Sequence, residues 1–508
     1  MKKTCLSVLF LAAWGFAQTN EELLNAGKNP ENVPMHSMGY DRKSYSPLNQ
    51  INKSNIKRLV PVWNVSLDNE LGEQGQPVIH DGVMFVSNAR WTYAIDAGTG
   101  KMIWRTAVKF DPDTPRVVCC GNSNKGVAIF EGKVFRGTLD EVNEHFQKNF
   151  WADGMPVIPP TLNRVEKFLQ FTDRKPDEVI GPCPPANRLA TVWNVAVNGV
   201  MAGCRPEYMP ILLAVIEAIV DPVYKIEDAG STPGWESLIV INGPIAKQLG
   251  FNAGQGVMRT GIQANTSVGR FLRLFLRNVA GFHHAPEGAD KGSIGQSFLV
   301  AAAENEEAVA EIGWLPYSVD RGFKAGDNIV TVQSVVAISA PTYTGSEKAV
   351  EHAELIADVI GQRACGYWTA IGMVYSNWHP LIMLGPSIAK VFAQDGWSKD
   401  DLRRYLYENV KMKASLAERY AYYCGQTGFR VNNYVKQGLL PPVYGESDDP
   451  ERLIPVFHRP EWIGIMVAGD WGRNQSKGYV SNHIQGPPVS KAIRLPKQWD
   501  ALLQDTRR

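Results

Sequence analysis

A change of sequence pattern near Asp140 constrains this chain more than any other feature. Before this residue, short runs of β-branched and aromatic residues alternate with turn dipeptides such as Asp81-Gly82, which indicates an all-β module. After it, long helical patterns alternate with short apolar runs, which is typical of an α/β domain. The sequence therefore predicts a mixed fold of two unrelated parts, residues 18–140 and 141–508.

Seven short strands are expected in the first part, and their spacing favours a sandwich or a propeller. They are Leu59–Val65, Gln76–Ile79, Val83–Ser87, Thr92–Ile95, Met102–Thr106, Val127–Phe130 and Lys133–Arg136. In the turn after the fourth, Asp96 and Thr99 are placed to bond backbone groups, and Gly100 to take a positive φ. Trp104 would offer a flat face to an adjacent sheet.

Several phrases of residues 30–140 resemble, in the same order, the N-terminal part of pyrroloquinoline quinone (PQQ) dependent alcohol and methanol dehydrogenases. Ala94–Trp104 resembles the tryptophan-docking motif of that eight-bladed propeller, Tyr45–Asn52 its N-terminal approach, Val118–Gly121 its vicinal cysteine pair and Gly137–Asp140 the end of a blade strand. The resemblance implies an oxidoreductase that uses PQQ on alcohols.

The resemblance also implies cofactor contacts. Cys119 and Cys120 would form a disulfide between neighbours that packs against one face of the quinone, and Thr138 would hydrogen-bond the cofactor. Lys125 stands where the family commonly has arginine, so the charge is kept but the bidentate fork is lost. Glu73 lies beside the acidic cofactor contact of the family, a position that alignment on the following Gln-Pro assigns to Gln74.

The module is short for a propeller. A blade takes roughly 40 to 50 residues and a ring needs four to eight blades, so there is room for two or three. The family's metal ligands and catalytic aspartate come from later blades, and no such motif follows Asp140. The open strand edge is expected to pair with a partner chain or a second copy. A calcium or lanthanide ion is expected only if a complete site is assembled, and the alternative is a remnant without PQQ chemistry.

The second part is expected to be an α/β domain. Its candidate helices are Leu162–Phe171, Glu207–Val220, Val268–Val279, Glu347–Ile360 and Lys399–Glu408, and its candidate strands are Ser237–Ile241, Ser297–Ala301, Ile329–Val335, Leu381–Leu384 and Trp462–Val467. Leu238–Lys247 and Leu381–Lys390 both read as strand, Gly-Pro turn and helix, which indicates an internal repeat. Amides near these turns could hold an anion, or the turns are simply tight connections in a duplicated fold.

Cys204 is the candidate nucleophile of the second part, and Glu207 is the second candidate catalytic residue. Cys204 is expected near a helix N-terminus and beside Arg205, and both features favour a thiolate. The alternative is a buried, unreactive cysteine.

Two further groups are candidates for chemistry. His283-His284 and Glu304–Glu307 could supply acid/base or metal chemistry, or could be solvated loop charges. No second ligand pair at metal spacing accompanies them, so no metal ligand is assigned. Gly469–Ser476 follows a predicted strand and could cradle an anionic ligand, although it lacks P-loop and dinucleotide spacing.

By its phrasing, the second part resembles the C-terminal part of a bacterial family known for a selenocysteine-Gly-Ser-Cys (UGSC) motif. The phrases are Gly154–Pro160, Asn198–Pro210 and Val240–Pro244. The half of the family that carries the motif has no counterpart here, and the family supplies no established reaction.

The first 17 residues have the pattern of a signal peptide, with Lys2-Lys3, an apolar run and small residues before Gln18. We therefore expect a periplasmic or secreted protein without a stable membrane anchor. Lys and Arg number 52 against 51 for Asp and Glu, so no net field favours nucleic acid, and the expected ligand is a small-molecule substrate. Three functions follow: a PQQ-dependent oxidoreductase, an α/β enzyme using a Cys204 thiolate, or a non-catalytic fusion or binding protein.

Overall fold

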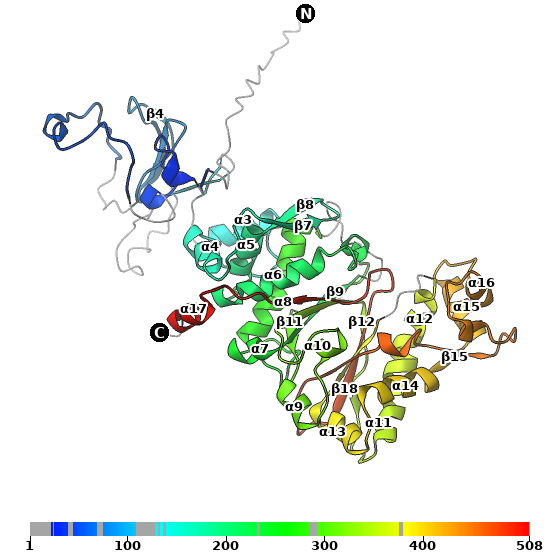
Figure 1. Cartoon of the computed structure of the whole chain (residues 1–508). Coiled ribbons are helices and arrows are strands. Elements are labelled where there is room, and N and C mark those ends of the chain that lie inside the picture. The colour runs from blue at the N-terminus through cyan, green and yellow to red at the C-terminus, as the bar shows by residue number, and fades with distance from the viewer. Residues whose placement is uncertain are drawn as a thin grey trace, which may run out of the picture. The chain divides into compact units, whose positions relative to one another are not determined.

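The structure is a computed structural model. It describes residues 22–23, 25–38, 44–68, 75–107, 127–130, 133–135, 139–230, 234–283, 288, 290, 292–295, 297, 299–374 and 379–506. The chain divides into two compact units, Met1–Val142 and Asn143–Arg508, and this division falls close to the change of pattern at Asp140. Figure 1 labels the elements of both units.

The first unit is built on one four-stranded antiparallel sheet in which successive strands are neighbours. Its strands are β1 (Val78–His80), β2 (Val83–Ser87), β3 (Trp91–Asp96) and β4 (Met102–Ala107), followed by a hairpin of β5 (Ala128–Phe130) and β6 (Lys133–Phe135). Asp81 and Gly82 both have positive φ in the β1–β2 turn, as a two-residue hairpin of this kind requires. This up-and-down order is that of one propeller blade.

The turn after β3 has the expected hydrogen bonds. The Asp96 carboxylate accepts from the backbone N–H and the hydroxyl of Thr99, at 2.8 and 2.7 Å, and Gly100 has a φ of 73°. The Trp63 indole N–H donates to the Ala97 carbonyl at 3.0 Å, and its ring would lie 2.6 Å from a Cβ at residue 100. Glycine is therefore required at this position for two reasons, its φ and the tryptophan packed on it.

The predicted strand Leu59–Val65 does not form. Leu59, Val60 and Val62 are 56%, 77% and 87% exposed, and no described strand pairs with this segment. Pro61 also lacks an N–H group for a strand ladder. The segment is instead held to the sheet by the hydrogen bond of Trp63 to Ala97. Its composition suits a strand, but no neighbouring described strand pairs with it.

The second unit contains two mixed sheets. The first has the order β10 (Ala301–Ala303), β9 (Glu236–Asn242), β11 (Ile329–Val335), β19 (Val489–Ala492). The second has the order β12 (Ala337–Ile338), β18 (Gln475–Val480), β14 (Leu381–Leu384), β17 (Gly464–Val467), with β13 (Thr342–Tyr343) also paired to β18. Two small hairpins are β7 (Val179–Cys183) with β8 (Arg188–Thr191), and β15 (Lys411–Lys413) with β16 (Leu453–Pro455).

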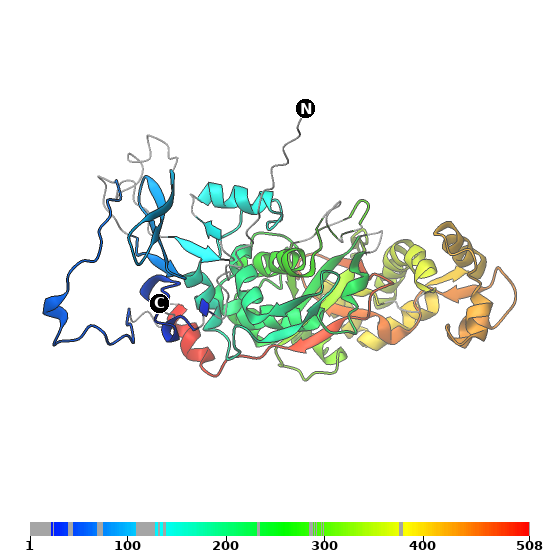
Figure 2. The same ribbon diagram turned by 90° about the horizontal axis from the view of Figure 1, so that it is seen from above.

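Helices cover these sheets. They are α4 (Leu162–Leu169), α5 (Val192–Ala202), α6 (Met209–Ile219), α7 (Pro244–Gln248), α8 (Gln263–Phe275), α9 (Glu306–Glu311), α10 (Tyr317–Asp320), α11 (Ala349–Ile356), α12 (Gly366–Gly372), α13 (Pro386–Gln394), α14 (Lys399–Asn409), α15 (Ala414–Tyr423), α16 (Val431–Lys436) and α17 (Trp499–Thr506), while α3 (Leu139–Lys148) spans the boundary between the units. Figure 2 shows α15 and α16, in orange and brown, at one end of the second unit. In the described part of the chain, no helix has both the length and the apolarity needed to cross a bilayer.

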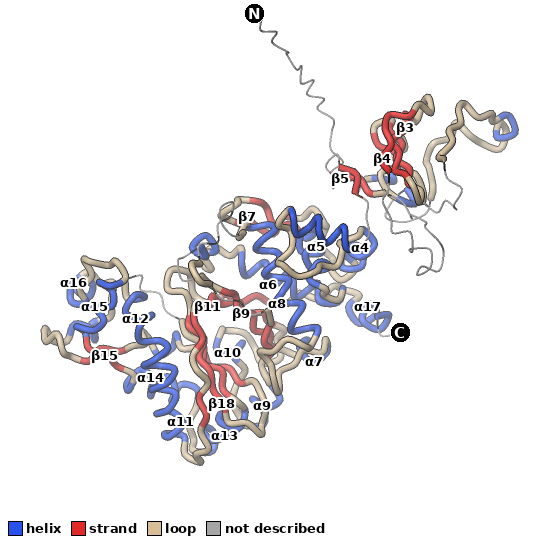
Figure 3. Tube along the Cα trace, turned by 180° about the vertical axis from the view of Figure 1, so that it is seen from behind, coloured by secondary structure: helices blue, strands red, loops and turns tan. Residues whose placement is uncertain are grey.

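Each sheet of the second unit has one face toward helices and one toward a shared apolar cluster. In β9, Ile239 and Ile241 lie in the helix-containing core, whereas Leu238 and Val240 lie in the shared cluster with Met383 of β14. This is the alternation that a strand buried on both faces produces. Figure 3 shows α6 and α8 near β9 and β11, and β18 contacts the helical segment Ala357–Cys365 that follows α11.

The two sheets repeat one topology. β9 and β14 are each followed by a Gly-Pro turn and a helix, and each pairs with a parallel strand, β10 or β17, and with an antiparallel strand, β11 or β18. The residue after each parallel strand makes the same bond: Glu304 N–H to the Ile241 carbonyl (3.1 Å), and Ala468 N–H to the Leu384 carbonyl (3.0 Å). The short sequence repeat therefore belongs to a larger structural duplication.

The two halves also exchange strands. β12 follows β11 in the chain but pairs with β18 of the other sheet, and β19 follows β18 but pairs with β11. The predicted strand Ser297–Ala301 is wrong in position. The observed strand β10 begins at Ala301, and its three alanines pair with Ile239–Ile241 of β9.

Candidate functional site

The residues that the resemblance assigns to PQQ all lie outside the described residues. They are Glu73, Cys119, Cys120, Lys125 and Thr138. Their roles remain predictions.

In the described part of the same unit, the last strand of the sheet, β4, has exposed apolar side chains. β4 pairs with β3, and the described residues place no strand along its other edge. Ile103 and Trp104 on this strand are 51% and 38% exposed, and the Trp104 ring contacts Phe85 of the same sheet, with centroids 6.0 Å apart. An edge that presents apolar side chains is a surface that another sheet can cover.

Cys204 is not the thiolate that the sequence predicts. It follows the left-handed cap of α5 at Gly203 (φ 79°), and the residue is 8% exposed. Burial raises the pKa of its thiol to about 12, although the Ser267 hydroxyl and Arg270 act in the opposite direction. The predicted lowering of this pKa is therefore wrong, because desolvation outweighs the nearby positive charge.

Glu207 is committed to a local ion pair. The residue is 1% exposed, and its carboxylate accepts from Nε of Arg205 at 2.6 Å. The Arg205 guanidinium also lies over the Tyr208 ring, 5.6 Å from its centroid. The cation that was expected to activate Cys204 instead neutralises Glu207.

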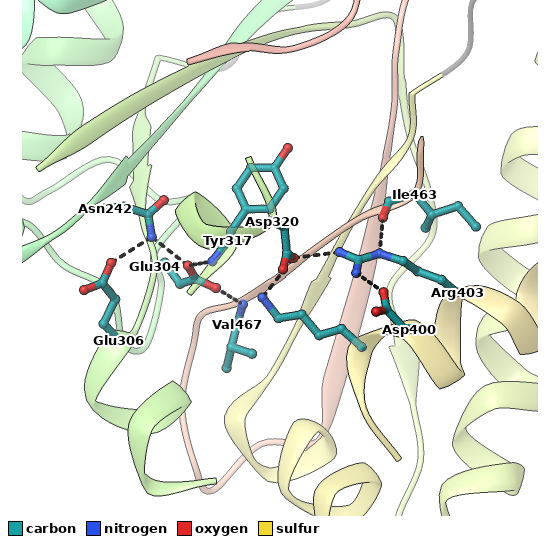
Figure 4. Close-up of polar contacts among 10 residues, drawn as sticks. Asn242, Glu304, Glu306, Tyr317, Asp320, Asp400, Arg403, Ile463 and Val467 are labelled. Carbon is teal, nitrogen blue, oxygen red and sulfur yellow. Dashed lines mark hydrogen bonds and ion pairs between the residues drawn. The ribbon is translucent and has the colours of Figure 1, made fainter. Parts of the chain in front are cut away.

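Glu304 is the centre of a buried network that joins the two sheets (Figure 4). Its carboxylate accepts from the Asn242 amide (2.7 Å), the Tyr317 backbone N–H (2.6 Å) and the Val467 backbone N–H (3.1 Å). Burial raises its pKa, and Lys399 and these donors oppose that shift. Three N–H donors fit an ionised carboxylate, so this residue holds β9 and β17 together and has no free oxygen for acid/base work.

A second set of charges lies close to this network. Lys399 and Arg403 of α14 both donate to Asp320, at 3.2 and 2.6 Å, and Arg403 also contacts Asp400 and the Ile463 carbonyl (Figure 4). A cavity of about 270 Å³ lies beside them. Because these charges already compensate one another, their arrangement is that of a structural network.

Another cavity of the second unit has a different charge pattern. It measures about 280 Å³ and lies where β14 and β17 end, beside Gly385 and Ala468. Val257, Met383 and Tyr479 line its apolar side, and all three belong to the shared apolar cluster. Its polar lining, which includes part of the predicted Gly469–Ser476 loop, contains three basic side chains and one acidic one: Arg259, Arg473, Lys477 and Asp470.

Sequence reasoning identified only part of this cavity. Asp470 and Arg473 lie in the loop that was expected to cradle an anion, whereas Arg259 and Lys477 were missed. Arg259 comes from a distant loop and Lys477 from a strand without a local motif, so only the tertiary fold brings them together. Of the predicted group of His283, His284 and Glu304–Glu307, Glu304 is bonded within the buried network described above. His284 lies outside the described residues, and among those residues no group of His, Cys, Asp and Glu side chains could hold a metal ion.

Comparison with known proteins identifies relatives of the first unit. The family model for the β-propeller domain of glucose, ethanol and alcohol dehydrogenases, which bears the cofactor abbreviation PQQ, matches residues 34–145. Quinoprotein alcohol dehydrogenase PedH of Pseudomonas putida is 41% identical over 155 residues, which is 29% of this chain and 26% of that protein. The dehydrogenase subunit of the quinone alcohol dehydrogenase of Komagataeibacter europaeus is 37% identical over 132 residues, 25% of this chain and 17% of that protein.

Solved structures match the same portion. A europium-containing methanol dehydrogenase is 33% identical with a TM-score of 0.23, covering 24% of this chain and 22% of that one. A quinohemoprotein alcohol dehydrogenase from Comamonas testosteroni is 38% identical with a TM-score of 0.22, covering 23% and 17%. The chain thus spans about a quarter or less of the length of these relatives. The resemblance of the second unit to the UGSC family has no support from these comparisons.

Proposed function

We propose that this chain is an exported oxidoreductase of the PQQ-dependent alcohol dehydrogenase type, whose propeller requires further blades from another chain. The observation that carries the proposal is the 41% identity to a quinoprotein alcohol dehydrogenase over 155 residues. The matched portion is 26% of that relative. The exposed apolar edge of β4 supports the need for a covering sheet, supplied by a partner or a second copy.

The residues matched to the family fit part of a quinone site by their chemistry. PQQ is a planar tricarboxylic quinone that accepts two electrons when an alcohol is oxidised. Cys119 and Cys120 would pack against its face, Lys125 would pair with a carboxylate, and Thr138 and Glu73 would approach its edge. A calcium or lanthanide ion belongs to the proposal only when later blades complete the donor set, since the described residues hold no such cluster.

Reconstitution tests this proposal. The mature chain is titrated with PQQ in the presence of Ca²⁺ and, separately, a lanthanide, and binding is followed by quinone absorbance and by dye reduction with ethanol. Saturable binding that Lys125→Met weakens about tenfold and Lys101→Met leaves unchanged supports it. Failure of PQQ to bind, with or without a complementing propeller fragment, would leave the first unit as a remnant.

Export is a separate part of the proposal. The leader-like pattern of residues 1–17 carries it. Expression in a Gram-negative host should give a soluble periplasmic protein whose N-terminus begins near Gln18. An unprocessed cytoplasmic chain would contradict export without touching the cofactor proposal.

The alternative based on a Cys204 thiolate has no support from the geometry. The thiol is buried with a raised pKa, and the neighbouring arginine serves Glu207. The cavity at the ends of β14 and β17 is the better location for ligand binding in the second unit.

A further inference from the structure

The cavity at the carboxyl ends of β14 and β17 contains cations without counter-charges. Arg473 lies 3.4 Å from Asp470, which also accepts from the Gly472 N–H, so these two charges compensate each other. Arg259 and Lys477 form no ion pair or side-chain hydrogen bond within the described residues, and Lys477 is half-buried. Two cations without a paired anion therefore line the same cavity, and their positive potential favours a negatively charged ligand there.

The same cavity has an apolar side. Three residues of the shared apolar cluster line it: Val257, Met383 and Tyr479. Tyr479 lies on the same face of β18 as Lys477, because the two are two residues apart in the strand. Its volume of about 280 Å³ is far larger than the roughly 30 Å³ of a single water. A ligand that suits it carries an anionic group at one end and a short apolar body at the other.

The duplication shows what occupies the equivalent place in the first half. The bonding of Glu304 to Ile241 and of Ala468 to Leu384 makes Glu304 and Ala468 equivalent, and the following Asn305 corresponds to Gly469. In the first half this position carries the Glu304 carboxylate, which accepts from Asn242 at the end of β9 and from the Val467 N–H of β17. In the second half Ala468 and Gly469 supply no such group, and the cavity is open there.

From these observations we propose that the cavity binds a small organic carboxylate with an apolar portion, held by Lys477 and Arg259. The carboxylate of the ligand would lie in the second half at the position that the Glu304 carboxylate occupies in the first. Its apolar part lies against Met383 and Val257. The proposal concerns the second unit alone and is independent of quinone binding by the first.

Isothermal titration of the full chain tests the proposal, with hexanoate as the probe, its neutral analogue hexanamide, and inorganic phosphate. We expect saturable hexanoate binding that is at least about tenfold tighter than that of hexanamide. Binding should weaken with added salt, because a charge pair near the surface is screened.

Variants locate the site. Lys477→Met and Arg259→Gln should each weaken hexanoate binding about tenfold, whereas Lys436→Met, an exposed lysine of α16, should not change it. Arg259 is exposed, so its variant remains informative even if Lys477→Met unfolds. Equal binding of hexanamide, unchanged affinity in both cavity variants, binding of phosphate but not hexanoate, or no binding at all would each overturn the proposal.

Discussion

At the scale of residues, burial raises the pKa of the Cys204 thiol more than its neighbours lower it. A helix start and an arginine both favour a thiolate, but the arginine is bound to Glu207 and the sulfur lies in the core. With its pKa raised to about 12 by burial, the thiol is protonated at neutral pH. This residue is therefore expected to behave as an apolar core side chain.

Thiol labelling checks this expectation. When the native chain is treated with iodoacetamide at pH 7.5, we expect modification of Cys424, which is only half-buried, well before Cys204, Cys183 or Cys365. In denaturant, all four should react at similar rates. Peptide mass spectrometry measures the extents, and native labelling of Cys204 as fast as Cys424 would show an accessible, ionised thiol.

Buried histidines make stability depend on pH. Burial and Arg459 lower the pKa of His458 to about 4, from an unfolded value near 6.5. The neutral folded form therefore contributes stability that is full above pH 6.5 and is lost as pH falls toward 4. Burial also lowers the pKa values of His379 and His483, to about 3 and about 4, so they act in the same direction.

The variant His458→Gln isolates one of these contributions. Between pH 6.5 and 5, we expect the free energy of unfolding of the parent to depend on pH more steeply than that of the variant, by about 1 kcal/mol per pH unit on average. Urea unfolding at four pH values gives both slopes. Because Glu304 and Glu236 have raised pKa values and act in the opposite direction, the difference between the slopes is the decisive quantity. Equal slopes would mean that His458 is already protonated when folded.

At the scale of elements, the Glu304 side chain connects the two sheets of the second unit through hydrogen bonds. It accepts N–H groups from the end of β9, from the start of α10 and from the end of β17. No other single side chain described here joins these three elements by carboxylate bonds. Its removal should therefore loosen both sheets together.

Glu304→Gln tests this role. Glutamine keeps one accepting oxygen but replaces the other with an amide N–H₂, which faces at least one of the three N–H donors, so we expect a loss of about 2 to 4 kcal/mol in the free energy of unfolding. The control is Glu307→Gln, since that carboxylate is exposed and paired only with the exposed Lys247; its change should be below about 0.5 kcal/mol. Urea denaturation compares them, and equal losses would refute the special role of Glu304.

Elements were predictable where periodicity was strong and local. The strands Val83–Ser87, Ile329–Val335 and Leu381–Leu384 have the predicted bounds, because short runs rich in apolar and β-branched residues between turns leave few alternatives. The polar strand Gln475–Val480 and the helix Val192–Ala202 were missed. The strand contains Ser, Lys and Gly, and it is a strand only because β14 and β12 lie on both sides of it.

The candidate site was less predictable than the elements. The loop after β17 was recognised from its position after a buried strand, which is a local signal. The cations Arg259 and Lys477 were not, because they meet only when two halves of the chain are folded together. The thiolate assignment to Cys204 failed for the same reason, since burial is a tertiary property.

At the scale of the whole molecule, the two units have separate cores. The large clusters that include Ile239 and Leu238 contain only residues of the second unit, whereas the first unit has a small cluster around Val78 and Val127. Apolar burial drives cooperative folding, so the second unit should fold without the first.

A fragment comparison checks this independence. Residues 143–508, expressed alone, should unfold cooperatively with a midpoint within about 3 °C of the corresponding transition of the full chain. Residues 18–142 alone should associate at micromolar concentration through the exposed β4 edge. Calorimetry and light scattering measure the two. A fragment 143–508 that fails to fold would show that the first unit stabilises the second.

The exchanged strands impose an order on biosynthesis. β19 pairs with β11, yet it is translated long after it, once β14, β17 and β18 have also been made. A nascent chain leaving the ribosome therefore carries β11 with one ladder edge unsatisfied while most of the second sheet is still being synthesised. An unpaired strand edge can pair with another chain, so the tendency to aggregate is expected to be greatest before β19 is present.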